Sequence, residues 1–293
     1  MIAITGVTGH LGRLVVEELL ASGVSASDIV GLARSPDRAE SLRERGVEVR
    51  RADYTEPESL SAALAGVDRL LLVSANEVGQ RLAQHRNVID AARAAGVGLL
   101  AYTSILRADR STMQLAVEHA GTEEAIRESG IPYTFLRNSW YIENYTENLA
   151  PALEHGVLLG SAGEGRVSAA TRRDYAAAAA AVIRGSGHEG KVYELGGDEA
   201  FTMAELAEEI SRASKRTVEY RDLPEEEYVR ALVGFGLPEP AARALADSDR
   251  ALARGELYTD SGDLRRLIGR ATKGWREVVR EAVETAVAGS GGR

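Results

Sequence analysis

The stretch TGVTGHLG, residues 5–12, follows an apolar run at residues 1–4 and precedes an amphipathic segment. Gly6, Gly9 and Gly12 are spaced three residues apart at this junction. In dinucleotide-binding turns the first glycine allows a tight turn, the second lets the backbone approach a pyrophosphate, and the third lets the helix pack closely on the strand. The helix start adds unpaired N–H groups and a positive dipole end. The stretch therefore predicts a dinucleotide site, and the competing interpretation is a glycine-rich turn that binds nothing.

Short apolar runs alternate with helical patterns along the first 140 residues. The runs, each predicted to form a strand, lie at residues 1–4, 29–33, 47–49, 70–73, 98–102 and 133–136. The longest helical patterns between them lie at residues 78–95 and 113–129. Strands that alternate with helices pair in parallel through right-handed crossovers. We therefore expect an α/β fold with a doubly wound parallel sheet of the Rossmann type.

The pattern changes after Trp140 and predicts a smaller, partly helical C-terminal lobe. The elements expected there are a helix at 141–153, an alanine-rich helix at 173–183, a strand at 192–195, a helix at 201–213 and short helices within 223–252. Thr202 and Glu205 have the spacing of a capping box. The expected division is an NADP-binding domain at residues 1–150, to which residues 170–195 return, and a substrate-side lobe at residues 151–169 and 196–293.

Composition limits the classes of function. The chain has 293 residues and a net charge of −9 spread along its length, whereas a nucleic-acid partner needs a basic face. It has no cysteine, which excludes disulfides and thiol nucleophiles, and its five histidines lack a short metal-binding spacing, so we assign no metal. No apolar stretch approaches the roughly 20 residues that cross a bilayer. We expect a cytoplasmic protein without a membrane partner, and the sequence leaves a homodimer open.

The end of the second predicted strand indicates which nucleotide binds. NAD enzymes commonly place an acidic residue about 20 residues after the glycines, where it binds the ribose hydroxyls. This chain has GLARSPDR at residues 31–38, with Arg34 in that place. A guanidinium binds phosphate through a planar fork of donors, so Arg34 predicts NADP(H); the alternative is a solvated loop arginine. At the next strand end, Asp53 either binds the adenine amino group or caps the segment that follows.

The chain lacks the acid pair that serves simple ketone reduction. Its glycine spacing resembles the extended and atypical short-chain dehydrogenase/reductases, most of which use a Tyr-x-x-x-Lys pair to protonate an alkoxide. The three lysines lie at positions 191, 215 and 273, too late for such a pair, and the equivalent region carries His119 and Glu123 on one helical face. A quinone or a cationic dye accepts a hydride with delocalised charge and needs mainly orientation in a dry pocket. The sequence therefore favours such acceptors.

Several longer segments carry a more specific resemblance. They are SANEVGQR (74–81), QHRNVIDAA (84–92), AYTSILRAD (101–109), LRNSWYIENY (136–145), LEHGVLLGSAGEG (153–165), ATRRDYAAAAA (170–180) and HEGKVYELGGD (188–198). Together with TGVTGHLG they resemble the bacterial type 2 NAD(P)H:quinone oxidoreductases, in the NmrA-like atypical group that also holds the triphenylmethane reductases. The resemblance covers nearly the whole chain. It implies a Rossmann-like fold, NADPH as the hydride donor and two-electron reduction of a quinone.

Carried over residue by residue, the resemblance implies a nucleotide site and a catalytic asparagine. The nucleotide site falls on Gly6, Val7, Thr8, Gly9, His10, Leu11, Arg34, Ser74, Ala75, Asn76, Asn138, Ser139, Trp140, Tyr141, Ile142 and Glu143. The catalytic asparagine falls on Asn144. Two residues depart from the family: Val7 replaces the usual alanine, and His10 stands where glutamine is common. Because His10 is near the phosphates, we expect a different, pH-dependent cofactor affinity.

The acceptor is expected to lie near Asn144 and Tyr141. An amide at Asn144 can donate a hydrogen bond to a quinone oxygen as negative charge builds there, and the alternative is an exposed helix asparagine. Tyr141 and Trp140 either stack on the flat acceptor or belong to the core. His119 as a proton donor is less favoured than a satisfied helix histidine. The arginines at 172–173 either reach the cofactor or form surface ion pairs.

Two other functions fit the same residues. The pocket could serve reduction of triphenylmethane or azo dyes. Some NmrA-like proteins instead bind NADP without turnover and act as redox-sensing regulators. The segment NSWYIENY at residues 138–145 favours an enzyme, because a pure sensor has little reason to keep it.

Overall fold

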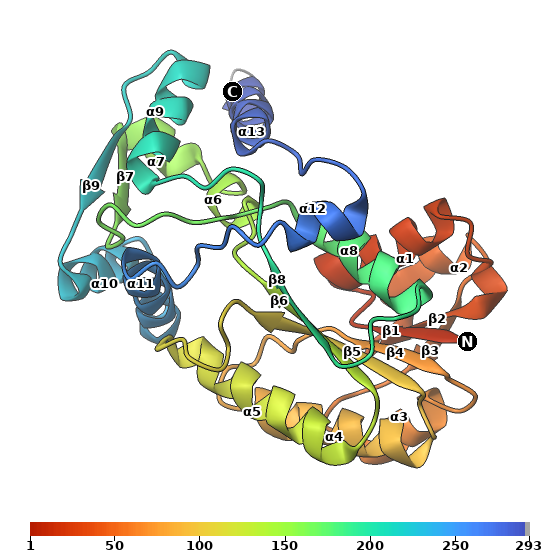
Figure 1. Ribbon diagram of the computed structural model, residues 1–293. Coiled ribbons are helices and arrows are strands. Elements are labelled where there is room, and N and C mark those ends of the chain that lie inside the picture. The colour runs from red at the N-terminus through yellow and green to blue at the C-terminus, as the bar shows by residue number, and fades with distance from the viewer. Residues whose placement is uncertain (291–293) are drawn as a thin grey trace.

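Seven parallel strands form the central sheet of the computed structural model, which describes residues 1–290 (Figure 1). Their order is β3-β2-β1-β4-β5-β6-β8. The strands are β1 Ile2–Thr5, β2 Ile29–Ala33, β3 Glu48–Arg51, β4 Arg69–Leu72, β5 Leu99–Ile105, β6 Tyr133–Asn138 and β8 Lys191–Leu195. The prediction of a doubly wound α/β fold is confirmed. The last three residues of the predicted lobe at 196–293 lie outside the described part of the chain.

Helices cover both faces of the sheet, so its central strands are nearly continuous apolar runs. One face carries α1 His10–Ala21, the short α2 Glu40–Arg43, α8 Arg172–Arg184 and α12 Asp263–Ile268. The other carries α3 Pro57–Ala63, α4 Arg81–Ala94 and α5 Gln114–Ser129. The alanines of α8 lie buried in the same core as α1, and their small side chains let the two helices approach closely.

Strand β5 is longer than its apolar pattern predicts. The expected strand ended at Tyr102, but Thr103, Ser104 and Ile105 continue the parallel pairing with β6. Both polar side chains are buried. Their backbones extend the sheet while their side chains reach its carboxyl edge, which is where a site on such a sheet lies.

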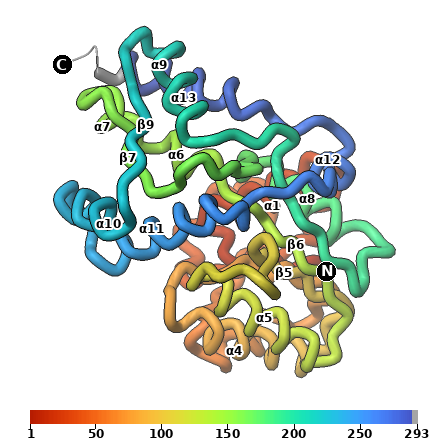
Figure 2. Tube along the Cα trace, turned by 60° about the vertical axis from the view of Figure 1, so that its left-hand side comes forward, coloured from red at the N-terminus to blue at the C-terminus, as the bar shows by residue number. Residues whose placement is uncertain are grey.

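A second lobe stands at the carboxyl edge of the sheet (Figures 1 and 2). It contains a two-stranded parallel sheet, β7 Val157–Gly160 with β9 Glu219–Asp222, that the sequence analysis did not anticipate. Its helices are α6 Glu143–Thr146, α7 Ala150–His155, α9 Met203–Ser214, α10 Glu225–Gly234, α11 Glu239–Ala253 and α13 Trp275–Ser290. Helix α9 begins with the predicted capping box, in which Thr202 accepts from the Glu205 N–H and Glu205 accepts from the Thr202 N–H.

The prediction of one helix at residues 141–153 is wrong, because α6 ends at Thr146 and α7 begins at Ala150. Pro151 lies at the start of α7. Proline has no N–H to donate and clashes with the preceding turn, so a helix can begin there but cannot run through. The break leaves Asn144 in a short helix at the edge of the sheet.

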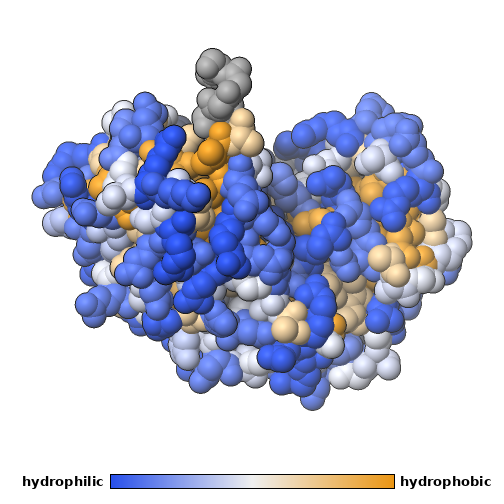
Figure 3. Space-filling view, turned by 90° about the horizontal axis from the view of Figure 1, so that it is seen from above, coloured by the Kyte–Doolittle hydropathy of each residue, from blue (hydrophilic) through white to orange (hydrophobic). Residues whose placement is uncertain are grey.

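No helix within residues 1–290 is both long enough and apolar enough to span a membrane. The face seen in Figure 3 is mostly hydrophilic, and its apolar side chains occur in small separate groups. Isolated groups of this size are ordinary for a protein surface.

Candidate active site

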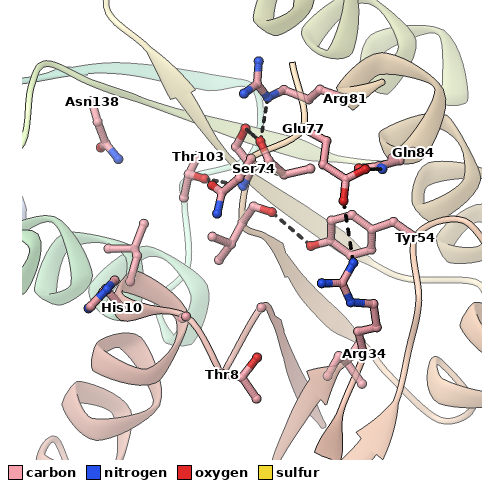
Figure 4. Close-up of a pocket in the computed structure, with 18 of the residues that line it drawn as sticks. Thr8, His10, Arg34, Tyr54, Ser74, Glu77, Arg81, Gln84, Thr103 and Asn138 are labelled. Atoms are coloured by element: carbon pink, nitrogen blue, oxygen red, sulfur yellow. Dashed lines mark hydrogen bonds and ion pairs between the residues drawn. The ribbon is translucent and has the colours of Figure 1, made fainter. Parts of the chain in front are cut away.

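A cleft of about 770 Å³ lies along the carboxyl ends of the strands β1 to β6 (Figure 4). Strands β1 and β4 are adjacent, and the strand order reverses between them. In open α/β sheets, ligands bind at such a switch point. Most of the predicted site residues line the cleft: Gly6, Thr8, Gly9, His10, Leu11, Arg34, Ser74, Ala75, Asn76, Asn138, Ser139, Trp140, Tyr141 and Asn144. Val7 and Ile142 are buried in the core instead. Glu143 does not line the cleft, and its Oε1 accepts the backbone N–H of Arg172.

The turn after β1 has the geometry that a pyrophosphate requires. Gly6 adopts a φ of +64°, which favours glycine, and a Cβ on Gly12 would lie 2.5 Å from the Gly6 carbonyl oxygen. Helix α1 has no side-chain cap and no acidic residue in its first turn. Its first N–H groups and the positive end of its dipole therefore remain available to an anion. The turn fits a dinucleotide.

Charged groups gather at the end of the cleft beside β2 and β3. Arg34 Nη1 lies 3.6 Å from Glu77 Oε1, and Gln84 Nε2 donates to the other Glu77 oxygen at 2.7 Å (Figure 4). Arg38 also lines this end. Burial would raise the pKa of Asp53, but hydrogen bonds from Thr55 and the nearby arginine charges lower it below its ordinary value. Because Arg34 is exposed, its guanidinium can leave Glu77 and bind a phosphate instead.

Asp53 does not cap α3, which was the predicted alternative to adenine binding, because the N-cap residue of that helix is Glu56 and it has no side-chain cap. Asp53 Oδ1 accepts from the N–H and the hydroxyl of Thr55, at 2.9 and 2.8 Å. This is a turn contact ahead of α3 rather than a cap on its first residue. Because Asp53 also lines the cleft, the contact and an adenine-binding role are compatible.

The middle of the cleft is held by hydrogen bonds between neighbouring strand ends. The Tyr54 hydroxyl donates to Thr5 Oγ1 at 2.6 Å, and Thr5 Oγ1 accepts the Val73 N–H. The Thr103 hydroxyl accepts the Ser74 N–H at 2.9 Å. These bonds fix the ends of β1, β3, β4 and β5 relative to one another, which gives the cleft a preformed floor.

The other end of the cleft is built by β6 and the short helix α6. Arg172 Nη2 donates to Asn144 Oδ1 at 3.0 Å, and the Arg172 guanidinium lies over the Tyr141 ring, 5.3 Å from its centroid. Arg172 also pairs with Glu147, and its backbone N–H donates to Glu143. With its oxygen engaged, the Asn144 amide is left with its N–H donors. Arg173 instead pairs with Glu17 and Glu18 of α1.

Two further polar groups near this end are informative. The Asn138 Oδ1 atom is buried without a hydrogen-bond partner among the described residues, and Figure 4 draws this side chain across the cleft from Arg34. A buried amide oxygen of this kind is suited to a donor supplied by a ligand. Burial raises the pKa of Tyr141, so its hydroxyl stays protonated at neutral pH. Tyr141 is therefore no activated acid of the Tyr-Lys kind.

Several residues of the cleft were not predicted to form it. Arg38, Glu77, Arg81 and Leu115 all line it, and so do Arg172 and His119, for each of which the sequence left two roles open. Arg38 could have been found, because it stands four residues after Arg34 in a loop that begins at a strand end. Glu77 and Arg81 directly follow the predicted residues 74–76 in the chain. Leu115 comes from α5, where no local pattern marks it as part of a site.

Known proteins resemble this chain closely. The family model described as the NmrA-like family matches residues 1–274. Quinone oxidoreductase 2 of Escherichia coli is 53% identical over 272 residues, which are 93% of this chain and 95% of that protein. The crystal structure of the NADPH-dependent Escherichia coli enzyme complexed with NADPH superposes with a TM-score of 0.94 at 52% identity, covering 96% of this chain and 99% of that one. The Citrobacter triphenylmethane reductase complexed with NADP(H) has a TM-score of 0.92 at 42% identity, covering 96% and 100%.

Proposed function

This chain belongs to the NmrA-like family, and on that premise we propose that it is an NADPH-dependent quinone reductase. It transfers two electrons as a hydride directly from the nicotinamide to a quinone. The observation that carries the proposal is a preformed dinucleotide cleft in a chain 53% identical to quinone oxidoreductase 2. The fold alone would not support it, because one fold serves many reactions.

Each part of the cleft has a binding role under this proposal. The glycine turn and the start of α1 hold the pyrophosphate, and Arg34 with Arg38 holds the 2′-phosphate. Ser74, Ala75 and Asn76 line the middle, and residues 138–141 line the nicotinamide end. Ile142 and Glu143 support this end from behind, where Glu143 accepts the Arg172 N–H. We assign residues 1–150 with 170–195 to the nucleotide-binding part and residues 151–169 and 196–293 to the substrate side. Helix α6 leads from the first part into the second lobe, and α12, in the last of these ranges, packs back on α8. In support, α8 packs on α1 and β8 extends the sheet.

The acceptor site works by orientation and hydrogen bonding rather than by a protein acid. NADPH supplies the hydride when it is bound. Tyr141 provides a flat apolar surface, and the Asn144 N–H donors are oriented by Arg172 toward a quinone oxygen. A hydrogen bond to an oxygen that gains charge during transfer stabilises the transition state more than the ground state. Because that charge is delocalised, the product oxygen can take its proton from water.

A second acceptor class has its own support. The triphenylmethane reductase of Citrobacter is 42% identical to this chain over nearly its whole length. A triphenylmethane dye is cationic and has three conjugated aromatic rings, and Tyr141 together with Trp140 offers aromatic surface to it. We therefore expect dye reduction in the same cleft as a second activity.

The central test is an acceptor panel. Purified protein should oxidise NADPH, followed by absorbance at 340 nm, when a benzoquinone or a naphthoquinone is added but not without an acceptor, with one mole of quinone consumed per mole of NADPH. If the nucleotide binds and no quinone or dye speeds its oxidation, the redox-sensing regulator replaces the enzyme. Cell fractionation tests the proposed cytoplasmic location, and sedimentation of the same sample decides between a monomer and a homodimer.

A further inference from the structure

His119 of α5 lies in the wall of the same cleft that Asn144 and Tyr141 line. The side chain is buried, with only 5% of the residue exposed, yet it lines the cleft together with Leu115 of the same helix. Its Nδ1 atom lies 2.7 Å from the hydroxyl of Tyr102, which is fully buried on β5. One nitrogen of the ring is therefore engaged inside the protein.

The surroundings of Tyr102 select the tautomer of this histidine. A buried hydroxyl must donate its hydrogen to an acceptor. The hydroxyl of Tyr102 has His119 Nδ1 as its hydrogen-bond partner, at 2.7 Å, while the hydroxyls of Thr122 and Ser74 lie farther off. Thr122 Oγ1 already accepts the Nδ1–H of His85, because His85 Nε2 accepts the Ala75 N–H, and the Thr122 hydroxyl donates to the Glu118 carbonyl oxygen. The lone pair on His119 Nδ1 is thus the acceptor for Tyr102. Neutral imidazole then carries its hydrogen on Nε2, at the ring edge that remains for the cleft.

The histidine stays neutral in this position. Burial lowers the pKa of His119 well below its ordinary value, and the charges of Arg81 and His85 lower it further. Burial also raises the pKa of Tyr102, so this hydroxyl cannot pass on a proton near neutrality. A proton lost from Nε2 could be replaced only by leaving a tyrosinate in the core. His119 is therefore unsuited to act as a proton donor, which was the less favoured of its two predicted roles.

We propose that the Nε2–H of His119 is a hydrogen-bond donor to the quinone oxygen, acting together with the amide of Asn144. The proposal rests on the quinone reductase function. One hydride reaches the quinone, one proton from water reaches its oxygen, and His119 keeps its own hydrogen throughout. The site then selects flat acceptors that present a carbonyl oxygen to this wall. A triphenylmethane dye takes the hydride at carbon and has no oxygen for this donor.

The test compares two substrates in the same variants. His119→Leu removes the donor, and we expect it to lower kcat with a naphthoquinone about tenfold, less than the 10²–10³ typical of an oxyanion donor because the charge is delocalised. Reduction of a cationic triphenylmethane dye should stay within about twofold, and so should the Kd for NADPH. His119→Gln keeps an N–H donor and should recover part of the quinone rate. Tyr102→Phe removes the hydroxyl that holds the hydrogen of His119 on Nε2, so it should also lower the rate with the quinone.

A second measurement does not depend on turnover. The carbonyl stretch of a quinone bound to the wild-type protein with NADP should lie at lower frequency than in the His119→Leu variant, because a hydrogen bond weakens the C=O bond. Unchanged quinone turnover with an unchanged stretch would overturn the proposal, and so would equal losses on quinone and dye. If the wild-type protein itself reduces no quinone, the function proposed above fails, which is a separate outcome. If the leucine variant does not fold, Tyr102→Phe is compared with the wild type in both measurements, because it removes the hydroxyl that fixes the donor tautomer.

Discussion

Arg34 is the residue that distinguishes the two nicotinamide cofactors. Its ion pair with Glu77 is exposed, with 69% and 54% of the side chains accessible, so it contributes little stability. A 2′-phosphate brings more charge and a geometry that matches the guanidinium fork. Arg34→Ala should therefore raise the Kd for NADPH roughly ten- to hundredfold, the range for hydrogen bonds to charged groups, and change that for NADH less than about threefold.

Fluorescence titration of each reduced cofactor measures the effect of Arg34→Ala. The matched control is Arg51→Ala, whose guanidinium pairs with Glu56 at 2.7 Å and does not line the cleft. Arg51→Ala should leave the Kd for NADPH and the Kd for NADH unchanged. Equal losses for NADPH and NADH in the Arg34 variant would remove the assignment of the 2′-phosphate to this arginine.

Arg172 acts through its neighbours, and we expect it to be a positioning residue. Removal of its guanidinium frees the Asn144 amide to rotate and uncovers the Tyr141 ring. Arg172→Ala should lower kcat with a naphthoquinone about five- to tenfold with little change in the KM for NADPH, and Asn144→Ala should lower it at least as much. Arg173→Ala is the control, because that side chain pairs with α1. A similar loss in both arginine variants would indicate a structural effect.

At the scale of an element, the junction between β1 and α1 leaves no room for a larger residue at Gly12. A Cβ on Gly12 would lie 2.5 Å from the Gly6 oxygen and 2.7 Å from the Thr5 oxygen, both backbone atoms that cannot move aside. Gly12→Ala should lower the free energy of unfolding by more than about 2 kcal/mol, as strain and overpacking do. Gly234→Ala in α10 meets open space and should raise it by up to about 1 kcal/mol. Urea unfolding measures both, and equal effects would contradict the close packing.

Elements with a local signal could be predicted, and elements that depend on distant partners could not. The strands of the main sheet, the glycine turn and Arg34 follow from apolar runs and from residues at strand ends. Strand β9 has the sequence EYRD, with no apolar alternation, and its register is set by β7 more than 60 residues earlier. His119 reaches the cleft only because β5 and α5 bring it there. Pro151 indicates a helix break in the sequence, but the helical pattern of the residues around it led to the prediction of one helix over 141–153.

On the scale of the whole molecule, one segment of the second lobe is fastened to the edge of the main sheet. The Arg107 guanidinium donates to the carbonyl oxygens of Gly255 and Tyr258, and the Ser139 hydroxyl donates to that of Leu257. The carboxylate of Glu256 accepts from Ser111 and Thr112. These bonds join the loops after β5 and β6 to the region that follows α11. The wall of the acceptor end is therefore supported by both parts of the chain.

The pH dependence of stability has a source in the second lobe. Asp249 of α11 accepts the Ser161 N–H at 2.8 Å, and burial raises its pKa to about 6, with the hydrogen bond opposing and Asp222 adding to the rise. Between about pH 4 and pH 6 the folded state holds this proton more tightly than the unfolded state. The free energy of unfolding therefore falls as the pH rises through this window, and the buried carboxylate is a cost at neutral pH.

Asp249→Asn should remove that cost while its amide oxygen keeps the Ser161 bond. We expect the variant to be more stable than the wild type by roughly 1–2 kcal/mol at pH 8, below the limit of about 3 kcal/mol set by the pKa change, and by about a third of that gain at pH 4.5. Urea unfolding at the two pH values measures the difference, with Asp260→Asn, an exposed carboxylate, as the control. A gain of equal size at both pH values would mean that packing rather than ionisation is responsible. A loss at pH 8 would mean that the charge of Asp249 is needed to hold Ser161, and so to join α11 to the turn after β7.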